Sequence, residues 1–108
     1  MEFIETPTFS RASKDLLDED AIRALQSFLL QNPEAGDLIS GAGGVRKIRW
    51  AAHNKGKRSG ARIIYYFVQT RATVYLIFAY AKNVKLDLTP TEKRLFAQLT
   101  KQLLNETP

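Results

Sequence analysis

The hydrophobic period of this chain changes at residue 45, and that change limits the folds it can adopt. From there on, three segments alternate with a period of two or are apolar on both faces: residues 45–51, 61–69 and 73–82. The last two segments are joined through residues 70–72, a connection that suits antiparallel neighbours and is too short for a parallel crossover. The second half of the chain therefore predicts a three-stranded antiparallel β-meander.

The segments before the meander carry weaker signals. Residues 2–6 alternate between apolar and polar side chains and are followed by Pro7, which predicts a short first strand. A helix is expected to begin at Ser10. Residues 36–44 hold four of the six glycines, so this segment predicts a loop whose backbone angles larger residues would resist.

Two further helices are predicted from their capping residues. One begins at Asp18, where acidic side chains fill the first turn ahead of apolar residues at helical spacing, and it ends at Asn32, which a proline follows. The other begins at Thr89, an N-cap residue followed by proline at the first helical position and by Glu92 three residues later. The expected fold is therefore α+β with the order β-α-α-β-β-β-α.

Length and composition restrict both the architecture and the chemistry. A chain of 108 residues supports one hydrophobic core, so we expect a single domain over residues 1–108. The absence of cysteine excludes a disulfide scaffold, thiol catalysis and cysteine-ligated metals, and one histidine leaves few ligands for a zinc site. No apolar run is long enough to cross a bilayer, and the N-terminus does not resemble a signal peptide. We therefore expect a cytoplasmic protein without a membrane partner.

The net charge of +5 is unevenly distributed along the chain. Residues 1–37 are acidic overall, whereas residues 38–86 contain ten lysines and arginines and no carboxylate, and the remaining residues are balanced. A long stretch of one sign favours a polyanionic partner such as RNA. The alternative is a solvated basic surface that serves solubility.

Four basic residues of the predicted sheet are candidates for catalysis. Lys47 and Arg49 lie two apart on one strand and project from the same face. Arg62 joins them if the next strand returns antiparallel, and Lys82 borders them at the end of the last strand. Such a cluster provides the charge and the N–H donors that bind phosphates and stabilise a phosphoryl-transfer transition state. Alternatively, these are ordinary strand residues on a solvated face.

Further basic residues are candidates for RNA contact, and other motifs predict structure. The loop of residues 53–60 mixes three positive charges with two glycines, which suits contact with a nucleic-acid backbone and equally suits a plain exposed hairpin. The glycines of residues 41–44 do not match a nucleotide-binding loop and predict a turn. The four tyrosines alternate along strands and are expected mainly in the core. The predicted RNA-binding residues are Arg46, Lys55, Lys57, Arg58 and Lys85.

Five stretches that together span most of the chain follow a recognisable pattern. They are residues 43–49, the basic loop that follows, residues 59–67, residues 80–83, and Asp87 with Leu88. In this order they resemble toxins of the RelE/ParE superfamily, closest to its HigB branch. The resemblance implies a RelE-like fold and a ribosome-dependent mRNA endonuclease that cuts translated mRNA in the ribosomal A site. It also implies a cognate antitoxin, of a helix-turn-helix, HigA-like type, that masks the toxin and represses the shared operon.

The reaction implied by the resemblance is transesterification, in which the ribose 2′-hydroxyl attacks the adjacent phosphate without a metal or organic cofactor. Lys47 and Arg49 match the two basic strand positions that the family uses near the nucleophile and phosphate, and Arg62 matches its phosphate-binding arginine. Lys82 matches a basic position more loosely. Asn83 and Thr89 stand where prototype members have an arginine and a tyrosine, so the resemblance does not supply a tyrosine base.

Lys47 is one candidate to assist proton removal, since the neighbouring positive charges disfavour its protonated form.

Two rival interpretations share the same basic cluster. One is a non-catalytic nucleic-acid-binding or regulatory module, and the other is an inactivated family member.

Overall fold

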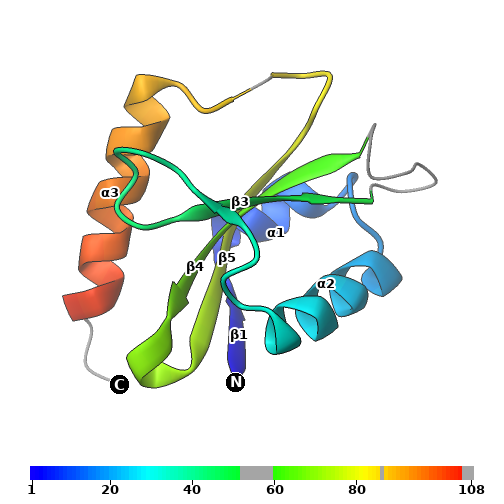
Figure 1. Cartoon of the computed structure of the whole chain (residues 1–108). Coiled ribbons are helices and arrows are strands. Elements are labelled where there is room, and N and C mark those ends of the chain that lie inside the picture. Colours follow the sequence, from blue (N-terminus) through cyan, green and yellow to red (C-terminus); the bar gives the residue numbers. More distant parts are fainter. Residues whose placement is uncertain (52–59, 86, 106–108) are drawn as a thin grey trace.

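The chain forms a five-stranded mixed sheet with helices on both of its faces (Figure 1). The computed structural model describes residues 1–51, 60–85 and 87–105. The strands lie in the order β1-β5-β4-β3-β2. Their bounds are β1 Glu2–Glu5, β2 Asp37–Leu38, β3 Arg46–Trp50, β4 Ala61–Val68 and β5 Thr73–Ala81.

The predicted meander is confirmed as the centre of this sheet. Strands β3, β4 and β5 are antiparallel neighbours, and a 3₁₀ turn over Gln69–Arg71 joins the last two. The N-terminal strand β1 runs parallel to β5 and completes one edge, which makes the sheet mixed. The short strand β2 pairs with β3 at the other edge. It falls inside the segment expected to be a loop, because a two-residue strand carries no detectable period.

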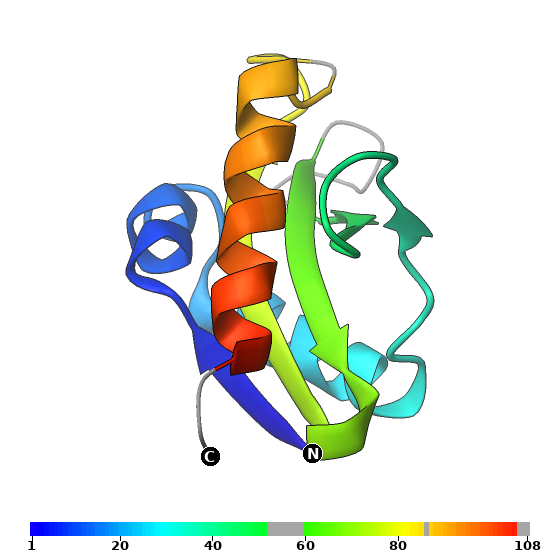
Figure 2. The same cartoon turned by 90° about the vertical axis from the view of Figure 1, so that its left-hand side faces the viewer.

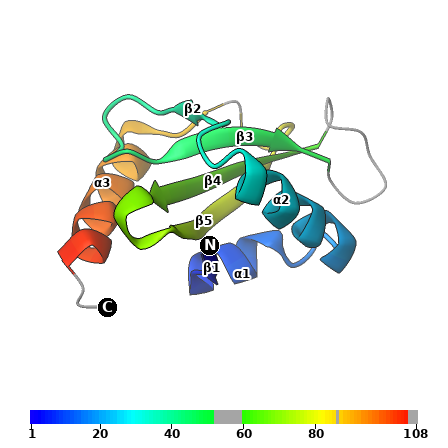
Figure 3. The ribbon, with the colours of Figure 1, turned by 60° about the horizontal axis from the view of Figure 1, so that its bottom comes forward.

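In the part of the chain that the structure describes, α1 (Pro7–Ser13) and α2 (Glu19–Gln31) cover one face of the sheet and α3 (Pro90–Asn105) covers the other. Figure 2 shows α3 in front of the sheet, and Figure 3 shows α3 on the left, apart from α1 and α2 toward the lower right. The apolar runs in β4 and β5 are therefore buried from both sides, as central strands should be. The architecture is the expected α+β fold.

Two hydrophobic clusters stabilise these layers. Phe9, Leu25 and Leu29 of the first two helices pack against one face of the sheet, which includes Ile63 and Leu76. On the opposite face, the cluster under α3 is formed by Val45, Ile64, Tyr66, Ile77, Leu88 and Leu103, among others. Trp50 belongs to the first cluster, and its indole N–H donates to the carbonyl of Ala21 at 3.0 Å.

The helix boundaries follow the capping chemistry. Asp18 caps α2 by accepting from the N–H of Ala21, and Thr89 and Glu92 form a reciprocal capping box at α3. Helix α1 begins earlier than expected, at Pro7 rather than Ser10. Thr6 is its N-cap and accepts from the N–H of Phe9, so the proline that follows starts a helix instead of only closing a strand.

Among the described residues, no helix is long and apolar enough to span a bilayer.

Candidate functional site

The strand register places three polar side chains in one row across the sheet. Arg49 of β3 lies opposite Arg62 of β4, and Arg62 lies opposite Tyr80 of β5. Lys47 lies two residues before Arg49 and therefore projects from the same face. This is the face that also carries α3, whereas Ile48 and Trp50 pack into the cluster under α1 and α2. The expected convergence of Lys47, Arg49 and Arg62, here called the basic face, is present.

Arg62 is the most unusual residue of the basic face, because it is 8% exposed. A buried guanidinium normally has carboxylate or carbonyl partners that compensate for its lost hydration. Among the described residues, the hydrogen bond found for its side chain runs from Nη1 to the carbonyl of Ala61 at 3.5 Å. Its cross-strand neighbour Arg49 carries the same charge, and like charges directly opposite are destabilising. This arrangement costs stability and favours the binding of an anion.

Lys47 is held at the edge of the basic face by an ion pair. Its Nζ lies 3.5 Å from a carboxylate oxygen of Asp87, whose side chain is 57% exposed. The N–H of Leu88 donates to the same carboxylate, and this hydrogen bond, with the charge of Lys47, lowers the pKa of Asp87 from its usual value. An exposed pair of this kind is weak, so an incoming phosphate can compete with Asp87 for the lysine.

Two further lysines border the basic face at the end of β5. Lys82 is exposed, and its backbone N–H donates to the carbonyl of Gly60 at 3.2 Å, which ties it to the start of β4. Lys85 forms an ion pair with Glu92 of α3, and its Nζ lies 5.4 Å from the ring centroids of Phe78 and Tyr80. Burial alone would raise the pKa of Glu92, but hydrogen bonds from Lys85 and from the N–H of Thr89 lower it.

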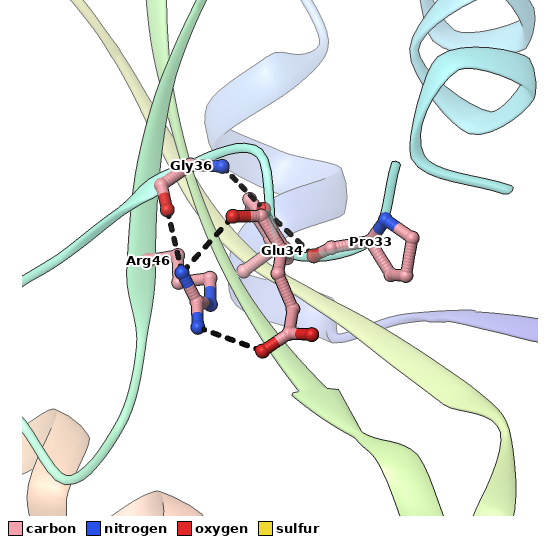
Figure 4. Close-up of polar contacts among 5 residues, drawn as sticks. Pro33, Glu34, Gly36 and Arg46 are labelled. Atoms are coloured by element: carbon pink, nitrogen blue, oxygen red, sulfur yellow. Dashed lines mark hydrogen bonds and ion pairs between the residues drawn. The ribbon is translucent and has the colours of Figure 1, made fainter. Parts of the chain in front are cut away.

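Arg46 lies on the opposite face of β3 and is not part of the basic face. Its guanidinium donates to the carbonyls of Glu34 and Gly36, at 3.1 and 2.8 Å, and pairs with the Glu34 carboxylate at 3.3 Å (Figure 4). Beside it, the hydroxyl of Tyr65 accepts from the N–H of Gly36 and donates to the carbonyl of Pro33. Arg46 thus fastens the segment after α2 to the sheet.

The remaining predicted RNA-binding residues, Lys55, Lys57 and Arg58, lie outside the described residues. A hollow of about 290 Å³ opens beside Lys47 and is lined by Asp37, Ser40, Asp87 and Lys93, among others. Within the described residues, no group of three or more histidine, aspartate or glutamate side chains could hold a metal ion.

Two residues of the site have roles that the sequence did not indicate. Tyr80 lies in the core, as expected, and it also lies directly opposite Arg62. The available signal was its place two residues before Lys82, on the same side of an alternating strand. Asp87 follows the predicted meander, and its contact with Lys47 depends on how the chain returns toward α3. Sequence spacing does not contain that information.

The fold and the basic face define a small α+β protein with a cationic site for an anionic ligand. The family model described as "RelE toxin of RelE / RelB toxin-antitoxin system" matches residues 1–107. The chain therefore belongs to the RelE toxin family. Membership makes it a toxin of a toxin–antitoxin system, in a family whose toxins have an antitoxin partner and generally act as ribosome-dependent mRNA interferases.

Proposed function

We propose that this chain is a ribosome-dependent mRNA endonuclease of the HigB branch, acting in the cytoplasm on mRNA in the ribosomal A site. The observation that carries the proposal is Arg62, a buried guanidinium next to a second arginine, with one long hydrogen bond among the described residues. An RNA phosphate would supply the missing negative charge and acceptor oxygens. Family membership supports RNA on the ribosome as the source of that phosphate.

In the proposed reaction, the ribose 2′-oxygen attacks the adjacent phosphorus and gives up its proton to water, and the bond from phosphorus to the 5′-oxygen breaks. The leaving 5′-oxygen takes a proton from water, so the products are a 2′,3′-cyclic phosphate and a 5′-hydroxyl. Arg62 and Arg49 bind the non-bridging oxygens and stabilise the additional charge of the transition state. Lys47 and Lys82 bind the same phosphate or its neighbour.

The other basic residues would extend RNA contact beyond the scissile phosphate. Lys85, at the end of β5, is placed to contact the flanking backbone once RNA competes with Glu92 for its charge. Lys55, Lys57 and Arg58 remain predicted contacts of the loop between β3 and β4. Because these contacts are electrostatic, we expect affinity for programmed ribosomes to fall steeply with salt. Arg46 would act indirectly, by holding β3 against the segment after α2.

We further propose that the partner is a helix-turn-helix, HigA-like antitoxin that masks the basic face and represses the shared operon. Inspection of the adjacent gene tests this directly. A neighbouring small helix-turn-helix protein that binds this chain and restores growth supports the assignment to the HigB branch, whereas an antitoxin of another fold contradicts it.

The decisive experiment maps mRNA ends on translating ribosomes with purified protein. We expect new ends within codons, each bearing a 5′-hydroxyl. Arg62→Ala should slow cleavage by on the order of a hundred-fold, because it removes a donor to the transition state. Arg23→Ala is a matched control, since Arg23 is an exposed arginine of α2 whose described partner is the neighbouring Asp20. It should cleave at the wild-type rate.

Intact transcripts and normal growth after induction would contradict the endonuclease and favour the non-catalytic binding module. Cleavage by Arg62→Ala at the unaltered rate would remove Arg62 from the mechanism while leaving the activity in place. An inactive wild-type chain that still binds programmed ribosomes would indicate an inactivated family member.

A further inference from the structure

The hydroxyl of Tyr80 is buried without a hydrogen-bond partner. Tyr80 is 5% exposed, and its hydroxyl is the one buried side-chain nitrogen or oxygen without a partner among the residues the structure describes. The buried hydroxyl of Tyr65, by contrast, has both an acceptor and a donor partner. An unsatisfied buried hydroxyl is unfavourable for the folded state. Its retention therefore calls for an explanation other than stability.

The position of Tyr80 supplies that explanation. It lies directly opposite Arg62, so the two side chains stand next to each other on the same face of the sheet. Arg62 is itself a buried donor with a single long hydrogen bond among the described residues. A hydroxyl without an acceptor, next to a guanidinium with one long hydrogen bond, can be satisfied together with it by one ligand group that is rich in acceptor oxygens.

The ring of Tyr80 is fixed by its surroundings. The ring centroid of Phe78 lies 6.0 Å away, and the ammonium group of Lys85 lies 5.4 Å from the Tyr80 centroid. Burial, with the nearby carboxylates of Asp87 and Glu92, raises the pKa of Tyr80, although Arg62 lowers it. The hydroxyl therefore keeps its proton at neutral pH and is a hydrogen-bond donor.

We propose that Tyr80 is a catalytic residue that donates a hydrogen bond to the phosphate held by Arg62 and strengthens that bond as charge develops in the transition state. This inference rests on the proposed function and adds a neutral donor to its cationic site. The hydroxyl is covered in the free protein, so RNA binding must move the side chains around it. Asp87 is the best candidate to move, because it is exposed, electrostatically coupled to Tyr80 and bound to Lys47 at 3.5 Å.

Two other roles for Tyr80 fit the observations less well. Base stacking requires an open ring face, and this side chain is almost fully buried. A purely structural role accounts for the packing of the ring but leaves the hydroxyl unexplained. Tyr80→Phe separates the ring from the hydroxyl, because it keeps the former and removes the latter.

The test compares Tyr80→Phe with Tyr66→Phe. Tyr66 lies on the same face and in the same cluster as Tyr80, but its neighbour on the adjacent strand is Tyr75 and not Arg62. Urea unfolding and single-turnover cleavage of mRNA on saturating ribosomes are measured for both. We expect Tyr80→Phe to keep or raise the urea midpoint and to slow cleavage by on the order of a hundred-fold. Tyr66→Phe should cleave at the wild-type rate.

Three outcomes would overturn the inference. Cleavage by Tyr80→Phe at the wild-type rate shows that the hydroxyl does not act in the reaction, while wild-type cleavage upholds the proposed function. A lowered urea midpoint for Tyr80→Phe shows that the hydroxyl has a structural partner in the free protein. Wild-type protein that leaves the mRNA intact removes the proposed function, and the inference fails with it.

Discussion

Replacing Arg62 by methionine should make the protein more stable and less active at the same time. Arg62 is 8% exposed, its described hydrogen bond is 3.5 Å long, and Arg49 lies directly opposite it. Replacing buried ionic groups by apolar side chains of similar volume is neutral or stabilising by about 1 to 4 kcal/mol. For Arg62→Met we expect the free energy of unfolding to rise by about 1 to 3 kcal/mol, since removal of the guanidinium also removes its repulsion from Arg49.

The assay is urea unfolding at low ionic strength, with Arg71→Met as a control of opposite sign. Arg71 donates to the carbonyls of Leu103 and Leu104 at the end of α3, with both hydrogen bonds 2.7 Å long. Because Arg71→Met loses these hydrogen bonds, its free energy of unfolding should be lower than that of the wild type by about 1 to 3 kcal/mol. Added inorganic phosphate should stabilise the wild type more than Arg62→Met, because it binds the folded site. An Arg62→Met protein that unfolds at lower urea than the wild type would refute the reasoning, since the guanidinium would then be satisfied in the free protein.

Three further predictions test the structure around the site. Tyr65→Phe should lower the free energy of unfolding in urea by about 1 to 3 kcal/mol, because it leaves the N–H of Gly36 unpaired. An unchanged urea midpoint would contradict this prediction. Gly43→Ala should lower the free energy of unfolding, measured by thermal unfolding, by about 2 to 4 kcal/mol, since φ is +74° and a Cβ would lie 2.6 Å from the Ala97 Cα. Gly41→Ala should lower it less, because a Cβ at Gly41 would meet open space. The lowered pKa of Asp87 stabilises the fold above pH about 4, and this contribution disappears as pH falls through the folded-state pKa. The free energy of unfolding of Asp87→Asn should therefore lie within about 1 kcal/mol of the wild-type value at neutral pH, and the two values should converge in acid.

Elements whose signals are local are predictable from the sequence. The start of α2 at Asp18 and the start of α3 at Thr89 both depend on a side chain that caps a neighbouring N–H, within three residues. Long apolar strands separated by a tight turn likewise pair in an antiparallel way with little ambiguity. The strand β2 was missed, since its two residues are defined by their hydrogen bonds to β3 rather than by their own pattern.

The site is predictable only where it depends on strand alternation. Lys47, Arg49 and Arg62 converge because residues two apart share a face and the next strand returns antiparallel. The burial of Arg62, and the placement of Tyr80 opposite it, depend on the register of three strands and on the packing of α3. Neither follows from spacing. The sequence grouped Arg46 with its basic neighbours, although alternation places it on the other face, where Glu34 pairs with it.

The charge segregation along the chain is partly reversed by the fold. Among the described ion pairs, three join a basic residue of the acid-free stretch to a carboxylate from outside it: Arg46 with Glu34, Lys47 with Asp87, and Lys85 with Glu92. Among the described ion pairs, none neutralises Arg49 or Arg62. Positive charge is therefore left uncompensated at the centre of the basic face and compensated around it. A surface built for solubility would expose its uncompensated charges, yet here one of them is buried between two strands. That placement favours a ligand-binding role, because a bound anion would offset the cost of burying Arg62.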